Sequence, residues 1–256
     1  MSRPARLPFE WPRTERLPLV IAHRGASASA PENTIAAFRR AVDDGADGVE
    51  LDVQLTSDGI AVVHHDRTLR RTTGRRGRLS SIGIDALGEL DCGSWFDTGF
   101  SDERVPTLAA VLELLGTHLI VNIELKSGGD LSLAEAVVDA VRATGTSRSV
   151  LLSSFDHRLV AALRDRAPDI ARGVLLKPLD FGAPSRAALR VGAQAVVMAR
   201  SQLRTDRVRD AHMHGLAVIV YTVDRPKEIA RCVHLGVDAI ITNDPAATRS
   251  ALDALS

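Results

Sequence analysis

The chain has 256 residues, of which 45% are hydrophobic and 25% are charged, a composition typical of ordinary globular proteins. These values exclude intrinsic disorder, collagen-like repeats and a coiled coil as the main state of the chain. Lys and Arg together number 32, as do Asp and Glu, so no net charge draws the molecule to nucleic acid or to an anionic membrane.

The first predicted element is a short apolar strand at residues 17–23, which follows a polar, proline-rich lead. Pro31 and the capping residues after it mark the start of a helix. Apolar side chains then recur at helical spacing as far as Gly45, which is expected to end that helix. Residues 48–55 form the next apolar strand.

The same unit, an apolar run followed by an amphipathic helix, recurs to the end of the chain. Six further strands are expected at residues 119–125, 149–152, 173–176, 195–198, 217–221 and 239–242. Helical patterns fill the intervals at about residues 131–144, 157–166, 184–191, 204–214, 226–235 and after Pro245. Continuous apolar runs are typical of strands buried on both faces, as in a parallel sheet. Eight such units predict an α/β fold of the (β/α)8 TIM barrel type.

One stretch, residues 59–104, interrupts this repeat. It holds a short strand at residues 60–63 and then a polar segment too long for an ordinary loop between a strand and a helix. We interpret it as a small insertion after the second strand, on the catalytic face, with the delayed helix at residues 107–115. Residues 1–256 are therefore expected to form a single barrel domain.

Carboxylates lie near the ends of two predicted strands, where barrel enzymes carry their active sites. Glu50 and Asp52 share one face of their strand because side chains alternate along it, and Glu124 and Lys126 share a face of another. Clustered carboxylates repel one another unless a cation lies among them, and oxygen ligands favour Mg²⁺ or Ca²⁺ over Zn²⁺. An ion pair with an arginine is the alternative for Glu50 or Asp52 alone.

Histidine is the natural acid or base near neutral pH, and His23 ends the first predicted strand. A hydrogen-bonded core histidine is the alternative for this residue. His64 and His65 are adjacent on an extended segment, so their side chains point in opposite directions and at most one is expected to reach the site.

Taken together, the ordered motifs from residue 18 onward resemble the signature of glycerophosphodiester phosphodiesterases. The motifs that carry the resemblance are HRGAS at 23–27, PENT at 31–34, GVELDV at 48–53, VHHD at 63–66, RTTG at 71–74, PTL at 106–108, IELK at 123–126, SSF at 153–155, GVD at 236–238 and IITNDP at 240–245. Each is weak alone, but their order and spacing are specific. The family fold is a (β/α)8 barrel with an insertion after its second strand.

The resemblance implies hydrolysis of a small-molecule glycerophosphodiester to sn-glycerol 3-phosphate and an alcohol, with one divalent cation, Mg²⁺ or Ca²⁺ and also Mn²⁺. It assigns the cation to Glu50, Asp52 and Glu124, acid–base catalysis to His23 and His65, phosphate binding to Arg24 and Lys126, and substrate binding to Tyr221. The motif of the family is His followed by Asp, which favours His65 over His64. Tyr221 stands where the family usually has Trp.

Three alternative functions remain open from the sequence. A lipid phosphodiesterase acting on lysophospholipids would use an apolar rim, which Trp95, Phe96 and Phe100 could supply unless they pack the insertion onto the barrel. A polyanion-binding module would use the arginines between residues 70 and 78. The third alternative is a metal-independent sugar-phosphate isomerase or aldolase of the same fold. An aldolase would need a Schiff-base lysine, for which only Lys126 and Lys177 are near strand ends.

The cellular location is predicted to be the cytoplasm. Cys92 and Cys232 are far apart and outside any zinc-ligand spacing, which favours reduced thiols. The N-terminal lead has no apolar run of signal-peptide length, and no stretch reaches the ~20 apolar residues of a membrane helix. We expect no nucleic-acid partner and no stable membrane insertion, and the sequence assigns no oligomeric state.

Overall fold

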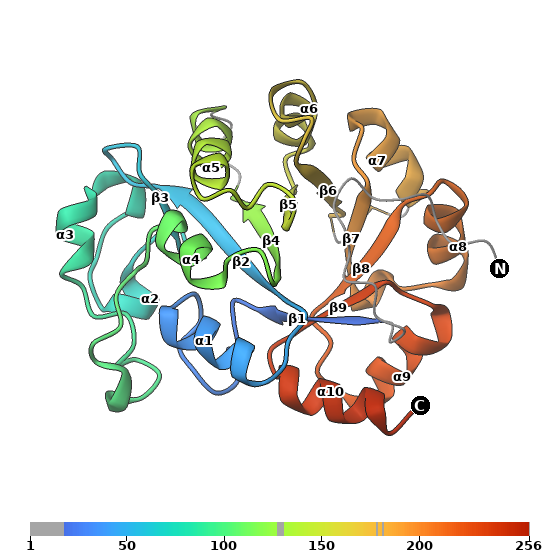
Figure 1. Cartoon of the computed structure of the whole chain (residues 1–256), viewed down its shortest axis with the longest axis horizontal. Helices are drawn as coiled ribbons and strands as arrows, with labels where there is room; N and C mark the ends of the chain where they lie inside the picture. Colours follow the sequence, from blue (N-terminus) through green and yellow to red (C-terminus); the bar gives the residue numbers. More distant parts are fainter. Residues whose placement is uncertain (1–17, 127–130, 178, 181, 256) are drawn as a thin grey trace.

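Eight parallel strands close into a barrel in the computed structural model, which describes residues 18–126, 131–177, 179–180 and 182–255. The strand order is β1-β9-β8-β7-β6-β5-β4-β2, and pairing of β1 with β2 closes the ring. Helices surround the strands (Figure 1). The expected (β/α)8 TIM barrel is therefore confirmed.

The barrel strands occupy short segments that match the predicted apolar runs to within a few residues. They are β1 (Leu19–His23), β2 (Gly48–Leu55), β4 (Ile120–Leu125), β5 (Val150–Ser154), β6 (Ala171–Leu175), β7 (Ala195–Ala199), β8 (Ala217–Tyr221) and β9 (Ala239–Thr242). The helices around the barrel are α1 (Ile35–Asp43), α4 (Leu108–Leu115), α5 (Leu131–Ala143), α6 (His157–Arg166), α7 (Pro184–Val191), α8 (Thr205–Met213), α9 (Pro226–Leu235) and α10 (Pro245–Asp253).

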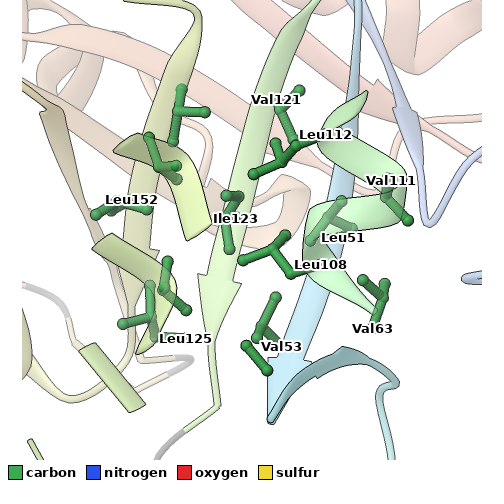
Figure 2. Close-up of a cluster of buried hydrophobic side chains, with 14 of the residues drawn as sticks. Leu51, Val53, Val63, Leu108, Val111, Leu112, Val121, Ile123, Leu125 and Leu152 are labelled. Carbon is green, nitrogen blue, oxygen red and sulfur yellow. The ribbon is translucent and has the colours of Figure 1, made fainter. Parts of the chain in front are cut away.

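Alternation along each strand separates two apolar regions. Leu51 and Val53 of β2 face outward and pack against α4, within the cluster drawn in Figure 2. The alternate positions point into the barrel, which is filled by small and branched side chains such as Ile21, Val197 and Ile219. Inward positions near the carboxyl ends of the strands carry the polar residues instead.

The turn between β1 and α1 shows why this segment folds as it does. Thr34 caps α1, since its hydroxyl accepts a hydrogen bond from the Ala37 amide at 3.2 Å. Gly25 has a φ of +81°, and a Cβ there would lie 2.6 Å from the Ala37 carbonyl carbon. Glycine thus allows the turn after β1 to lie directly against the helix.

The insertion predicted at residues 59–104 follows β2 on the carboxyl side of the barrel. Its first element, β3 (Ala61–Val63), pairs antiparallel with β2, and α2 (Arg70–Thr73) and α3 (Ile84–Gly88) follow. The insertion lies at the left of Figure 1. It has a small core of its own, formed by Val62, Leu69, Leu79, Ile82, Leu87, Cys92 and Val105.

The proline-rich lead, with the expected absence of a signal peptide, lies outside the described residues. Among the helices that the structure describes, none combines the length and the apolar character needed to cross a membrane.

Candidate active site

The predicted site residues lie at one end of the barrel, because strand register brings their positions side by side. His23 of β1 is opposite Glu50 of β2, and Asp52 of β2 is opposite Glu124 of β4. All four occupy inward positions of their strands. Parallel strands thus turn three sequence-distant motifs into one polar layer.

The three carboxylates form a compact group with two basic side chains. One oxygen each from Glu50, Asp52 and Glu124 lies within 4.8 Å of the others. Lys126 Nζ is 3.1 Å from Asp52 Oδ1 and 2.8 Å from Glu124 Oε1, and Arg24 Nε is 3.2 Å from Asp52 Oδ2. Three negative groups therefore face two positive ones, which leaves one negative charge uncompensated when all are ionised.

Ionisation is opposed most strongly at Glu50. Burial raises the pKa of Glu50 well above its usual range, and the charges of Asp52 and Glu124 raise it further. Burial and Asp52 also raise the pKa of Glu124. Burial opposes ionisation of Asp52, but Lys126 and Arg24 hold the pKa of that carboxyl below its usual value. An additional cation would stabilise the ionised form of Glu50.

This donor set fits a hard divalent cation. Two buried carboxylates, Glu50 and Asp52, and the half-buried Glu124 offer oxygen ligands, which Mg²⁺ and Ca²⁺ prefer. Beside them, the Asn33 amide donates to Asp52 Oδ2 at 2.9 Å, while the Asn33 carbonyl oxygen is buried without a hydrogen-bond partner. A buried, oxygen-rich layer with a surplus negative charge could hold a metal ion.

Arg24 is fixed by an unusual backbone conformation and by acidic partners. Its φ is +56°, which only a few per cent of non-glycine residues adopt. Its amide donates to the Glu50 backbone carbonyl at 2.8 Å, and its Nη1 donates to Glu32 Oε1 at 2.8 Å. The guanidinium therefore lies at the carboxylate group rather than in solvent.

His23 lies next to Glu50. Its Nε2 is 3.9 Å from Glu50 Oε2, and its Nδ1 forms a 2.7 Å hydrogen bond with Asn243 Oδ1. Burial, and then the charge of Arg24, lower the pKa of His23. A cavity of about 490 Å³ borders this side chain and includes Arg24 and Asp224 in its wall.

The two adjacent histidines have different surroundings. His64 is buried, and its ring nitrogens bind the Asp66 carbonyl at 2.9 Å and the Thr72 hydroxyl at 3.0 Å. His65 is half-buried, pairs with Asp66 Oδ1 at 2.7 Å, and its charge contributes to lowering the pKa of Asp52. His64 is thus hydrogen-bonded within the insertion, whereas the charge of His65 acts on Asp52.

A chain of ion pairs connects Arg24 with His65. Glu32 binds Arg24 and also accepts two hydrogen bonds from Arg71, at 2.9 and 2.7 Å. Arg71 Nε in turn donates to Asp66 Oδ2 at 2.7 Å, and Asp66 binds His65. Arg71 belongs to the insertion, so these ion pairs connect the insertion with both Arg24 and His65.

Tyr221 ends β8 at an inward position and is half-buried. Burial, followed by the charge of Glu124, raises the pKa of Tyr221 to about 12. The phenol is therefore neutral at physiological pH and lies near enough to Glu124 to sense its charge.

Several residues with clear contacts to the site were assigned no role from the sequence. Gln54 Nε2 donates to the backbone carbonyls of residues 64, 65 and 66, at 2.8, 3.1 and 2.8 Å, and so fixes the loop that carries His65. Its inward position on β2, two residues after Asp52, was the available signal. Asn33, Glu32 and Asn243 lie within the quoted motifs, but hydrogen bonds between loops cannot be read from spacing.

The structure bears on two of the alternatives. An aldolase requires a lysine with a lowered pKa, whereas Asp52 and Glu124 outweigh burial and raise the pKa of Lys126, and Lys177 is exposed. Of the arginine cluster proposed to bind polyanions, Arg71 is engaged by Glu32 and Asp66. The expectation of no nucleic-acid partner stays a prediction.

The chain also matches known proteins in sequence. Residues 23–247 match the model of the glycerophosphoryl diester phosphodiesterase family. Over 230 residues the chain is 40% identical to a protein of Caldanaerobacter subterraneus subsp. tengcongensis named glycerophosphodiester phosphodiesterase, which covers 89% of this chain and 94% of that protein.

Solved structures agree with the sequence comparison. A phosphodiesterase from Oleispira antarctica, in complex with the product sn-glycerol-3-phosphate, superposes with a TM-score of 0.86 at 30% identity, covering 93% of this chain and 97% of that one. For the glycerophosphodiester phosphodiesterase from Agrobacterium tumefaciens str. C58 the TM-score is 0.81 at 32% identity, with 91% and 100% covered. The resemblance seen in the motifs is confirmed, and the chain belongs to the glycerophosphoryl diester phosphodiesterase family.

Proposed function

We propose that this phosphoric diester hydrolase is metal-dependent and converts glycerophosphodiesters to sn-glycerol 3-phosphate and an alcohol. The observation that carries the proposal is the group of Glu50, Asp52 and Glu124, with His23 next to Glu50 and the charge of His65 acting on Asp52. The names of the relatives and the product bound to the Oleispira antarctica structure support the substrate class.

One divalent cation, Mg²⁺ or Ca²⁺ and also Mn²⁺, is assigned to Glu50, Asp52 and Glu124. Such an ion, when bound, neutralises negative charge on the phosphoryl group. Arg24 and Lys126 would contact the phosphate oxygens, since their charged groups already lie against the carboxylates of this layer. These ion pairs fix the Arg24 and Lys126 side chains before the substrate binds, which reduces reorganisation of the site during the reaction.

His23 and His65 are assigned to proton transfer. One imidazole accepts a proton from the attacking hydroxyl as the new P–O bond forms, and the other donates a proton to the departing alkoxide as the old P–O bond breaks. The attacking hydroxyl belongs to water, or to the glycerol moiety in a route through a cyclic phosphate that water then opens. Both routes yield the same products.

Tyr221 is assigned to the organic part of the substrate. Its ring lies at the end of the barrel that holds the carboxylates, and its neutral hydroxyl can donate a hydrogen bond. The smaller ring, in the place of the tryptophan usual in the family, would leave more room beside the alcohol or glycerol group.

A second candidate substrate class is favoured by one observation. Trp95 and Phe96 of the insertion are 41% and 36% exposed, and the Trp95 ring lies under the Arg71 guanidinium, 5.7 Å from its centre. Three successive ion pairs, through Glu32 and Arg24, connect Arg71 with Asp52 of the carboxylate layer, so these aromatic side chains could contact the acyl chain of a lysophospholipid bound there.

Product analysis tests the function and separates the two substrate classes. The enzyme, loaded with Mg²⁺, Ca²⁺ or Mn²⁺ in separate reactions, is incubated with glycerophosphocholine, glycerophosphoethanolamine and lysophosphatidylcholine. Release of sn-glycerol 3-phosphate from the first two supports the proposal. A preference for lysophosphatidylcholine would favour the second class, and no hydrolysis of any diester with any of these metals would contradict both.

A further inference from the structure

We propose that Asn243 and Asp224 form a positioning pair that holds His23 with its proton on Nδ1, which leaves Nε2 as the nitrogen that exchanges protons with the substrate. Asp224 lies between β8 and α9, and Asn243 lies between β9 and α10. The catalytic part of this inference rests on the proposed function, whereas the position of the proton does not.

The hydrogen bonds of Asn243 determine which His23 nitrogen carries the proton. Asn243 Oδ1 lies 2.7 Å from His23 Nδ1 and 3.0 Å from the Ser27 hydroxyl oxygen. A carbonyl oxygen accepts hydrogen bonds and cannot donate them. The proton between Asn243 and His23 must therefore belong to Nδ1.

Asp224 determines the orientation of the Asn243 amide. Asn243 Nδ2 donates to Asp224 Oδ2 at 2.8 Å, and the Asn243 backbone amide donates to Asp224 Oδ1 at 2.8 Å. If the side-chain amide were reversed, its oxygen would face the Asp224 carboxylate and its NH₂ group would face Nδ1 of His23. The carboxylate excludes that orientation because two acceptors would then meet.

The carboxylate of Asp224 is itself held by the barrel. Thr242, the last residue of β9, donates from its hydroxyl to Asp224 Oδ1 at 2.9 Å. Thr242 is buried and also accepts a hydrogen bond from the Thr248 hydroxyl of α10 at 2.9 Å. A rigid strand end thus fixes the carboxylate, the amide and the imidazole in sequence.

The other ring nitrogen of His23, Nε2, lies on the side of the carboxylate layer. It is 3.9 Å from Glu50 Oε2. In the Nδ1–H tautomer this nitrogen has a free lone pair, so a neutral His23 can accept a proton there and later return it. In the opposite tautomer the lone pair would point at Asn243, away from the layer, and proton exchange with substrate would stop.

Nitrogen NMR of protein labelled with ¹⁵N-histidine tests the position of the proton directly. The His23 signals are identified by their loss in His23→Gln, at a pH where the ring is neutral. A protonated Nδ1 and an unprotonated Nε2 are expected in the wild type. A proton on Nε2 would overturn the inference, whether or not the enzyme hydrolyses glycerophosphodiesters.

Substitutions then test the pair. Asp224→Asn removes the group that fixes the Asn243 amide, so we expect the His23 proton to distribute over both nitrogens. We expect kcat for glycerophosphocholine to fall about 10- to 100-fold, the usual loss when a residue that orients a site group is removed, with KM little changed. The double variant Asp224→Asn/Asn243→Asp exchanges donor and acceptor, and should restore both the tautomer and kcat.

Asp238→Asn is the matched control, because Asp238 also binds a histidine, His212, at 2.9 Å, but precedes β9 at the opposite end of the barrel. It should leave the His23 signals and kcat unchanged, and thermal denaturation of each variant separates loss of fold from loss of rate. Failure of the double variant to restore the tautomer, or normal kcat in Asp224→Asn, would overturn the proposal. If His23 of the wild type carries its proton on Nδ1 but the enzyme hydrolyses no glycerophosphodiester, the proposed function is wrong and the inference about the positioning pair is still supported.

Discussion

His64 and His65 are adjacent in the chain, yet His64 is part of the insertion's hydrogen-bond network, whereas the charge of His65 acts on the carboxylate layer. His64 is 4% exposed and binds Thr72 and the Asp66 carbonyl. His65 binds the Asp66 side chain and its charge acts on Asp52 and Glu124. We therefore expect His64 to contribute to stability and His65 to catalysis.

Exchanging each histidine for alanine should separate these two roles. His65→Ala is expected to lower kcat by ~10²–10⁴, the usual contribution of a general acid or base, with little change in Tm. His64→Ala should keep kcat near the wild-type value but lower the free energy of unfolding by about 1–3 kcal/mol, because Thr72 and the Asp66 carbonyl lose a buried partner. Steady-state kinetics and urea denaturation measure both. A catalytically dead His64→Ala with an active His65→Ala would reverse the assignment.

Arg71 provides a second test, because it binds Glu32 through two nitrogens and Asp66 through a third. Arg71→Gln should lower kcat/KM about 10- to 100-fold, since it frees the groups that orient Arg24 and His65. Arg71→Lys should recover only part of this loss, as an ammonium cannot form the paired contact. Arg70→Gln, an exposed neighbour on α2, is the control and should be neutral. Equal effects at positions 70 and 71 would exclude a positioning role.

Glu50→Gln tests whether the carboxylate layer needs a cation. Folding raises the pKa of Glu50, so the folded state binds the proton more tightly and its stability falls as pH rises from the unfolded to the folded pKa. At neutral pH with chelator, Glu50→Gln removes this cost and should raise Tm by ~2–4 °C, the shift given by about 1 kcal/mol in a chain of this size. Mg²⁺, Ca²⁺ or Mn²⁺ should raise the Tm of the wild type but not that of Glu50→Gln. An equal metal-dependent shift in both proteins would place the ion elsewhere.

Trp95 allows the substrate classes to be distinguished at the level of one side chain. If it contacts an acyl chain, Trp95→Ala should lower kcat/KM for lysophosphatidylcholine and leave that for glycerophosphocholine unchanged. Met213→Ala is the control, since Met213 is 70% exposed at the end of α8, where the chain returns to the opposite end of the barrel. If Trp95 only packs the insertion, through its contacts with Phe96 and Arg71, both substrates should respond equally.

The carboxylate layer could be predicted from the sequence because it follows from two regularities. Alternation along a strand fixes Glu50 and Asp52 on one face, and closure of a parallel barrel brings Glu124 beside them. The family motif favours His65 over His64, since alternation along the strand shows only that their side chains point in opposite directions. The position of the His65 backbone depends on Gln54, whose contacts lie in a turn.

Contacts between distant loops could not be predicted in the same way. His23 and Asn243 are separated by 220 positions, and Glu32 and Arg71 by 39. Their hydrogen bonds depend on how irregular segments of the barrel end and the insertion pack together, for which no periodic pattern exists. The insertion itself was predicted from its length and polarity, but its core around Leu79 and Leu87 was not.

The most direct test of the central claim is the release of sn-glycerol 3-phosphate from glycerophosphocholine by chelator-treated enzyme, before and after addition of Mg²⁺, Ca²⁺ or Mn²⁺. The proposed mechanism predicts no turnover without metal, recovery with at least one of these ions, and no recovery in Asp52→Asn, which keeps the shape of the site but removes a carboxylate. Full activity in chelator, or recovery in Asp52→Asn equal to that of the wild type, would contradict it.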